Sequence, residues 1–292
     1  MESSKNSNQD RQNYLLKAVI YHYIKPLFFS FLACFSAMVL ALFLHHLCTY
    51  VMIKSLGYEA SVSHWWIIGA PLDTQYWSLR RVIVVNGFGS LFCFISSFFI
   101  LNFSKRLEVI DSKLRVFFLW FSINCFTMLN ANIILGIIDY GNYATPFYSG
   151  FTIIYTWMYF PKVLIGVLVA LSIIMQFFIS RVFVNEFLFF VGNKGEIKSS
   201  SSRVNSLINI GVFPLLLSGV IYIFLSGYPV EFYFNSIRFF LILITLLSIY
   251  VVFISKVNSK FDNVMRIEDG INQHLYYISV FSFLLLLYWR FL

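Results

Sequence analysis

Long apolar stretches, separated by short polar ones, follow one another along almost the whole chain. A bilayer core about 30 Å thick needs about 20 consecutive apolar residues in an α-helix, and each stretch has about that length. The pattern therefore predicts an all-α integral membrane protein with about seven transmembrane helices, the count lying between six and eight. The predicted spans are residues 27–53, 82–101, 114–138, 163–183, 207–225, 237–255 and 275–292.

Two segments depart from this pattern. Residues 1–26 form a polar N-terminal segment. Residues 140–160 are rich in aromatic and turn-forming residues, which favours an interfacial or re-entrant segment over a regular span. Residues 27–292 show no soluble domain, so we predict one polytopic membrane domain.

Composition agrees with a membrane protein and narrows its partners. Only 12% of the residues are charged and 59% are apolar, whereas a soluble domain has about 25% charged residues. This excludes a soluble enzyme, a disordered chain and a secreted disulfide scaffold. The net charge of +8 comes mainly from basic residues in short loops. There they orient the chain and contact the lipid bilayer, so no nucleic-acid partner is expected.

The distribution of Lys and Arg predicts the orientation. Fifteen of the 21 fall on the side of the N-terminus and six on the other side. The positive-inside rule then places the N-terminus in the cytoplasm and the C-terminus outside, in a cytoplasmic-type membrane. The six residues assigned to the outer side are Lys54, Arg80, Arg81, Lys162, Arg238 and Arg290.

Two predicted spans carry polar or small residues at helical spacing, so that each set shares one helix face. Such faces are typical of helix–helix packing in membranes, and we expect that role here. The residues are Asn124, Thr127 and Asn130 in span 114–138, and Asn86, Ser90, Cys93 and Ser97 in span 82–101.

Candidate chemistry begins in LFLHHLCTYVMIKSLG (42–57). This segment resembles the first motif helix of the site-2 protease-like intramembrane zinc metallopeptidases, in which an HExxH signature is followed by small residues and a glycine. His45 matches the first histidine and Gly57 the later glycine. VVNGFGSLF (84–92) is similar to the small-residue helix that follows in that family.

A third segment extends the resemblance. LNANIILGIIDYG (129–141) is similar to the family's Asn…Pro…Asp-Gly motif and places Asp139 on the metal-ligand aspartate. The first three predicted spans (27–141) are therefore metallopeptidase-like, and the remaining spans (163–292) lie outside the resemblance. The family's motif lies near the cytoplasmic face, whereas the charge distribution places His45 near the outer one.

The catalytic signature is incomplete. In HExxH, two histidines one turn apart bind zinc and the glutamate acts as general base. Here His46 occupies the glutamate position and Thr49 the second histidine position, and the third motif lacks its proline. We therefore expect no zinc proteolysis by the family's mechanism.

A reduced zinc site is a remaining hypothesis. His45 and Cys48 are three residues apart on one helix face, and Asp139 closes the third span. Imidazole, thiolate and carboxylate together would give zinc three protein ligands and an open position. His46 is a further, weaker candidate. The alternative is that both histidines hydrogen-bond to backbone or water near the end of a span.

These observations predict a metallopeptidase-like membrane protein that is non-proteolytic, a pseudoenzyme, and that binds another membrane protein. This hypothesis predicts that the first three spans pack together and bring Asp139 to His45. One alternative is an accessory or scaffold subunit of a membrane complex, which predicts exposed small-residue grooves. A transporter would need a polar cavity at mid-membrane. An active zinc-dependent intramembrane peptidase is the least favoured alternative.

Overall fold

The computed structural model describes residues 24–58, 60–63, 66–68, 78–106, 112–140, 150–188, 200–226, 236–238, 240–243 and 273–291. Within these ranges the fold is helical apart from one small hairpin. The hairpin pairs β1 (Ser61–Ser63) antiparallel with β2 (Trp66–Ile68). The helical elements are α2 (Lys25–Ser55), α3 (Leu79–Arg106), α4 (Ser112–Asp139), α5 (Gly150–Trp157), α6 (Lys162–Leu188), α8 (Ser200–Leu207), η4 (Ile208–Val212), α9 (Phe213–Ser226) and α11 (Gln273–Phe291).

Five of the described helices are long and apolar enough to cross a membrane. They are α2, α3, α4, α6 and the η4–α9 region, and they coincide with the first five predicted spans. The protein is therefore a helical, multi-pass membrane protein. The apolar part of α11 is shorter, and most of the predicted span 237–255 lies outside the described residues. The predicted count of seven stays a prediction.

Helix α2 has sequence-encoded ends. It begins with Pro26 in its first turn, where a fixed φ suits the helix and no N–H is needed. It ends in a Schellman motif, in which the N–H of Tyr58 donates to the carbonyl of Ile53 at 3.3 Å and that of Gly57 to Lys54 at 3.0 Å. Gly57 has φ +82°, a left-handed conformation that favours glycine. The glycine of the family-like motif therefore caps a helix.

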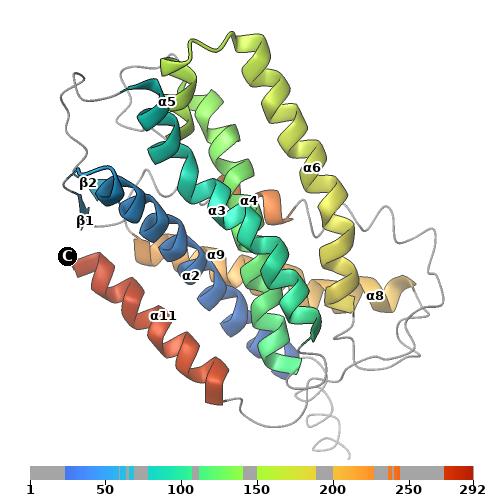
Figure 1. Ribbon diagram of the computed structural model, residues 1–292. Coiled ribbons are helices and arrows are strands. Elements are labelled where there is room, and N and C mark those ends of the chain that lie inside the picture. The colour runs from blue at the N-terminus through green and yellow to red at the C-terminus, as the bar shows by residue number, and fades with distance from the viewer. Residues whose placement is uncertain are drawn as a thin grey trace, which may run out of the picture.

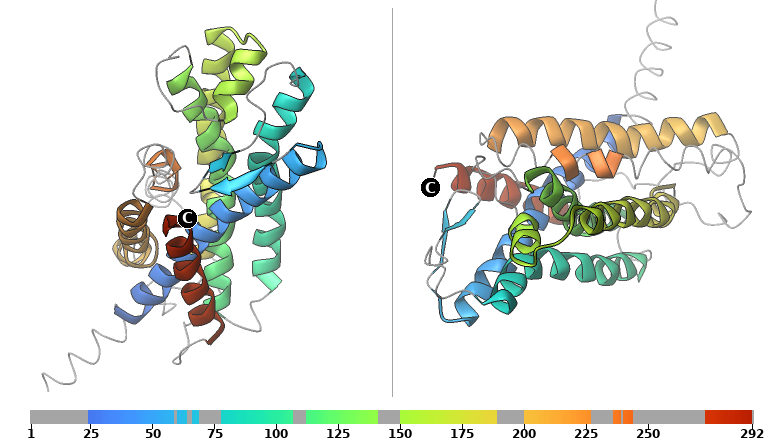
Figure 2. Two further views of the ribbon diagram at one scale, coloured as in Figure 1. Left: turned by 90° about the vertical axis from the view of Figure 1, so that its left-hand side faces the viewer. Right: turned by 90° about the horizontal axis from the view of Figure 1, so that it is seen from above.

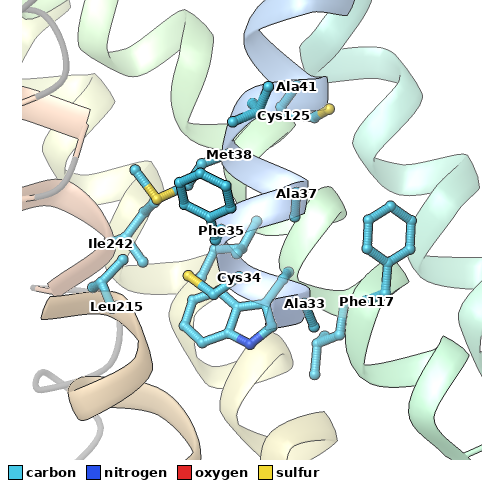
Figure 3. Packing of buried hydrophobic residues seen from close by; sticks show 14 of the residues in the cluster. Ala33, Cys34, Phe35, Ala37, Met38, Ala41, Phe117, Cys125, Leu215 and Ile242 are labelled. Atoms are coloured by element: carbon cyan, nitrogen blue, oxygen red, sulfur yellow. The ribbon is translucent and has the colours of Figure 1, made fainter. Parts of the chain in front are cut away.

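Helix α2 is the centre of the bundle. Helices α2, α3 and α4 each contact the other two, and α2 also contacts α9 and α11 (Figure 1). Ala33, Ala37 and Ala41 are fully buried at four-residue spacing, and small side chains allow neighbouring helices to approach closely. They belong to one buried hydrophobic cluster together with Phe117 and Cys125 of α4 (Figure 3). The predicted packing of the first three spans is confirmed.

The remaining helices lie around this centre. In the views of Figures 1 and 2, α8, η4 and α9 form one rod that crosses α4 and α6 steeply, so α9 and α6 are not both upright in one membrane. Helix α6 packs on α4 at the edge of the bundle. Helix α11 runs beside α2 in the same direction, and the hydroxyls of Ser279 and Ser36 are 3.0 Å apart.

A proline explains how α9 joins α2. Pro214 has no N–H to donate to the carbonyl four residues earlier, that of Ile210. This part of the chain is a π-helical turn, and the hydroxyl of Ser30 donates a hydrogen bond to the Ile210 carbonyl. Ser30 in turn accepts a hydrogen bond from the indole nitrogen of Trp120 at 2.9 Å. One buried hydroxyl thus connects α2, α4 and η4.

In the described part of the aromatic segment predicted for residues 140–160, the helical element is the short α5. Helix α5 has eight residues, about 12 Å at 1.5 Å per residue, which is too short to cross a bilayer. The hydroxyl of Tyr155 donates to the carbonyl of Ile133 at 3.2 Å and holds α5 against α4. Residues 141–149 lie outside the described residues, so the choice between interfacial and re-entrant stays open.

Candidate functional site

The first candidate residue, His45, lies in a polar junction between the three central helices. Its Nε2 is 3.0 Å from the hydroxyl of Ser90 in α3. The same hydroxyl accepts a hydrogen bond from Nδ2 of Asn132 in α4 at 2.7 Å. Asn132 also donates to the carbonyl of Met128 at 3.1 Å. One imidazole, one hydroxyl and one carboxamide therefore join α2, α3 and α4 inside the bundle.

Close helix approach makes this junction possible. A Cβ on Gly89 of α3 would lie 2.6 Å from the backbone oxygen of His45, and it would also clash with the hydroxyl of Thr49. That hydroxyl donates to the His45 carbonyl at 3.1 Å. Only a glycine fits at this position, and it brings Ser90 within reach of His45. The small-residue segment 84–92 thus has a packing role here.

A second polar junction lies near the middle of α4. The Nδ2 of Asn130 donates to Oε1 of Gln176 in α6 at 2.7 Å, and Nε2 of Gln176 donates to the carbonyl of Leu241 at 3.5 Å. The Oδ1 of Asn124 accepts a hydrogen bond from Nη2 of Arg238 at 3.1 Å. The predicted role of Asn124 and Asn130 in helix–helix packing is therefore confirmed.

The other residues of the two predicted stripes differ in their partners. Thr127 bonds to the carbonyl of Asn124 in its own helix at 3.0 Å, and Asn86 to that of Val82 at 2.9 Å. The backbone carbonyl of Ser97 accepts from the hydroxyl of Ser122 in α4 at 2.6 Å. Helical spacing thus predicts which residues share a face. Which of them bonds to a neighbouring helix depends on the residues that this helix places opposite.

Arg238 requires a correction. The distribution of basic residues assigns it to the outer side, whereas it is 2% exposed beside Asn124, close to the middle of α4. The short helical stretch that carries it lies on the side of α4 that faces the α8–α9 rod, and its Nη2 reaches Asn124 (Figures 1 and 2). A predicted span beginning at residue 237 places Arg238 at a span end, and only the tertiary structure reveals its depth.

A buried ion pair lies at the other end of α4 from Asp139. The Nη2 of Arg115 is 2.8 Å from Oε2 of Glu186 in α6, and Nζ of Lys105 in α3 is 3.5 Å from Oε1. Arg115 is 2% exposed. Glu186 was not among the predicted site residues because it lies three residues beyond the predicted span 163–183, whereas α6 continues to Leu188. A polar Gln176 inside that span was a signal for interhelical bonding.

The predicted metal ligands are only partly described. His45 bonds to Ser90, the ring centroids of His45 and His46 lie 5.3 Å apart edge to face, and Cys48 is buried. Among the described side chains no three His, Cys, Asp or Glu residues gather closely enough to hold a metal. Asp139 ends α4, seven residues or about 10 Å beyond Asn132, and its side chain is outside the described part. The zinc site therefore stays a prediction.

The polar groups in the interior mainly hold the helices together. Amide, hydroxyl and imidazole groups bond to one another between helices, which is how polar groups are accommodated in a bilayer. A scan against family models, a search of curated proteins and a search of solved structures find no match to this chain. The resemblance to the metallopeptidases therefore rests on the sequence motifs alone.

Proposed function

We propose that this protein is a non-proteolytic membrane protein that resembles the site-2 protease-like metallopeptidases and acts by binding another membrane protein inside the bilayer. The exposed face of α6 carries this proposal. Of the five candidate spans, α6 is the least covered, with 17% of its most apolar window buried against 72% for α4. It stands at the edge of the bundle (Figure 1).

The exposed face of α6 has the features of a helix-binding surface. Gly166 has open space where a Cβ would be, and Ala170, four residues later, is exposed. Small residues at this spacing let a second helix approach closely in a membrane. Val163 and Val167 flank them with 79% and 48% exposure. An accessory subunit, the alternative predicted from sequence, would use the same surface.

The interior supports a non-catalytic role. His45, which matches the first histidine of HExxH, bonds to Ser90, and the glutamate that would serve as general base is replaced by His46. Neither the second zinc histidine nor the glutamate base of HExxH is present at its motif position. Binding in the membrane does not need either of them.

A photocrosslinking experiment tests the binding surface. A photoreactive amino acid at Val167 is expected to give a discrete protein adduct in native membranes, which Gly166→Leu abolishes because the added bulk holds a partner helix away. Ile95→Phe, on the exposed face of α3, is the control and should leave the adduct unchanged. Adducts to lipid alone would contradict the proposal.

Metal content separates this proposal from the enzyme alternative. We expect protein purified in mild detergent, without chelator or histidine tag, to hold far less than one zinc per chain by plasma mass spectrometry. About one zinc per chain, lost in a His45→Ala/Asp139→Ala variant, would support the three-ligand site and call for peptidase assays.

We also propose that the N-terminus is cytoplasmic and the C-terminus outside. The parallel directions of α2 and α11 put the first residue of α2 and the last of α11 at opposite ends of the bundle, in support of this orientation (Figure 1). Reporter fusions at both termini test it. We expect a cytoplasmic reporter to be active at the N-terminus and a periplasmic-type reporter at the C-terminus. The reverse pattern would overturn the orientation.

A further inference from the structure

The exposed face of α3 joins an apolar surface to a cationic end. Phe99, Phe103 and Arg106 follow one another at spacings of four and three residues, so they share one helix face. Phe99 is 72% exposed and Phe103 50%. Arg106, the last residue of α3, is exposed, and Lys105 stands beside it. An apolar surface that ends in positive charge matches the shape and charge of a phospholipid.

An ion pair next to this end of α3 holds the neighbouring charged side chains in place. Glu186 holds Arg115 through one carboxylate oxygen and Lys105 through the other, at 2.8 Å and 3.5 Å. Arg115 is buried, so its charge stays in place at the end of the bundle. Arg106, the sequence neighbour of Lys105, adds a further exposed cation at this end of α3. Among the described side chains at this end, three positive charges thus stand against the one negative charge of Glu186, which ties Lys105 of α3 and Arg115 of α4 to α6.

We infer that this end of α3 binds the phosphate of an anionic phospholipid, with its acyl chains along Phe99 and Phe103. Lys105 and Arg106 would contact the headgroup, because both side chains are exposed, whereas that of Arg115 is buried. Basic residues at a membrane surface attract anionic lipid by this mechanism. This inference concerns a different surface from the exposed face of α6 and does not depend on the proposed function.

Native mass spectrometry of the full chain in neutral detergent tests the inference, with dioleoyl phosphatidylglycerol as the probe and dioleoyl phosphatidylcholine as its neutral counterpart. We expect the wild type to retain phosphatidylglycerol selectively. Lys105→Gln/Arg106→Gln should weaken that binding about 25-fold, since each cation near the surface contributes about fivefold. Arg80→Gln/Arg81→Gln removes two cations from the opposite end of the same helix and should change affinity less than twofold.

Three results would overturn the inference. They are wild-type affinity in Lys105→Gln/Arg106→Gln, an equal loss in Arg80→Gln/Arg81→Gln, and displacement of the lipid by excess glycerol phosphate. The last would show that a headgroup binds without its acyl chains. Lys105→Arg keeps the charge and should keep binding. Unchanged melting temperatures would show that the variants remain folded.

Discussion

Replacing Ser30 tests whether its buried hydroxyl, which bonds to two other helical elements, stabilises this fold. The hydroxyl accepts a hydrogen bond from the Trp120 indole and donates one to the Ile210 carbonyl, and all three residues are buried. Ser30→Ala therefore leaves a buried N–H and a buried carbonyl without their partner. Each such group costs roughly 1–3 kcal/mol, and bonds between membrane helices lie toward the low end, about 0.6 kcal/mol on average. We expect Ser30→Ala to lower the free energy of unfolding by about 2 kcal/mol.

A substitution of Pro214 gives a second test of the same hydrogen bonds. Pro214→Ala restores an N–H four residues after Ile210, which can then donate to the freed carbonyl. In that background Ser30→Ala removes the partner of the indole alone, so its cost should fall to about 1 kcal/mol. The coupling of about 1 kcal/mol would exceed the 0.3–0.5 kcal/mol scatter of independent substitutions.

Reversible unfolding in mixed micelles, followed by tryptophan fluorescence and circular dichroism, measures both quantities. Ser55→Ala is the matched control, because Ser55 is an exposed serine of the same helix that bonds to the Met52 carbonyl at 2.8 Å. Its loss should change stability by less than about 0.5 kcal/mol. Equal costs for Ser30→Ala and Ser55→Ala, or an equal cost of Ser30→Ala with and without Pro214, would refute the reasoning.

Two further substitutions test other parts of the bundle by the same unfolding assay. Gly89→Ala should destabilise by roughly 1–3 kcal/mol, because its methyl group would meet the His45 backbone oxygen. Gly166→Ala, with open space around it, is the control, and similar effects of the two would contradict the close approach. Glu186→Gln should cost about 3 kcal/mol, because it removes the carboxylate beside the buried Arg115. An unchanged unfolding midpoint would mean that this ion pair has no net stabilising effect.

The positions of the helices were predictable to a large extent from local sequence. A run of about 20 apolar residues must satisfy its backbone within a helix when it enters a bilayer, and this requirement needs no knowledge of neighbours. The first five predicted spans therefore match helices, and the described residues from 150 to 157, at the end of the turn-rich segment, form a short one. The Schellman end of α2 at Gly57 is likewise encoded locally.

The partners of the polar groups were not predictable from local sequence. Spacing places Asn124 and Asn130 on one face, but their partners, Arg238 and Gln176, come from segments 114 and 46 residues away. The depth of Arg238, the extension of α6 to Glu186, and the steep crossing of α9 depend on how helices pack. Hydropathy records which residues enter a bilayer. Only contacts between helices distant in sequence decide which polar groups are satisfied there and which face is left for a partner.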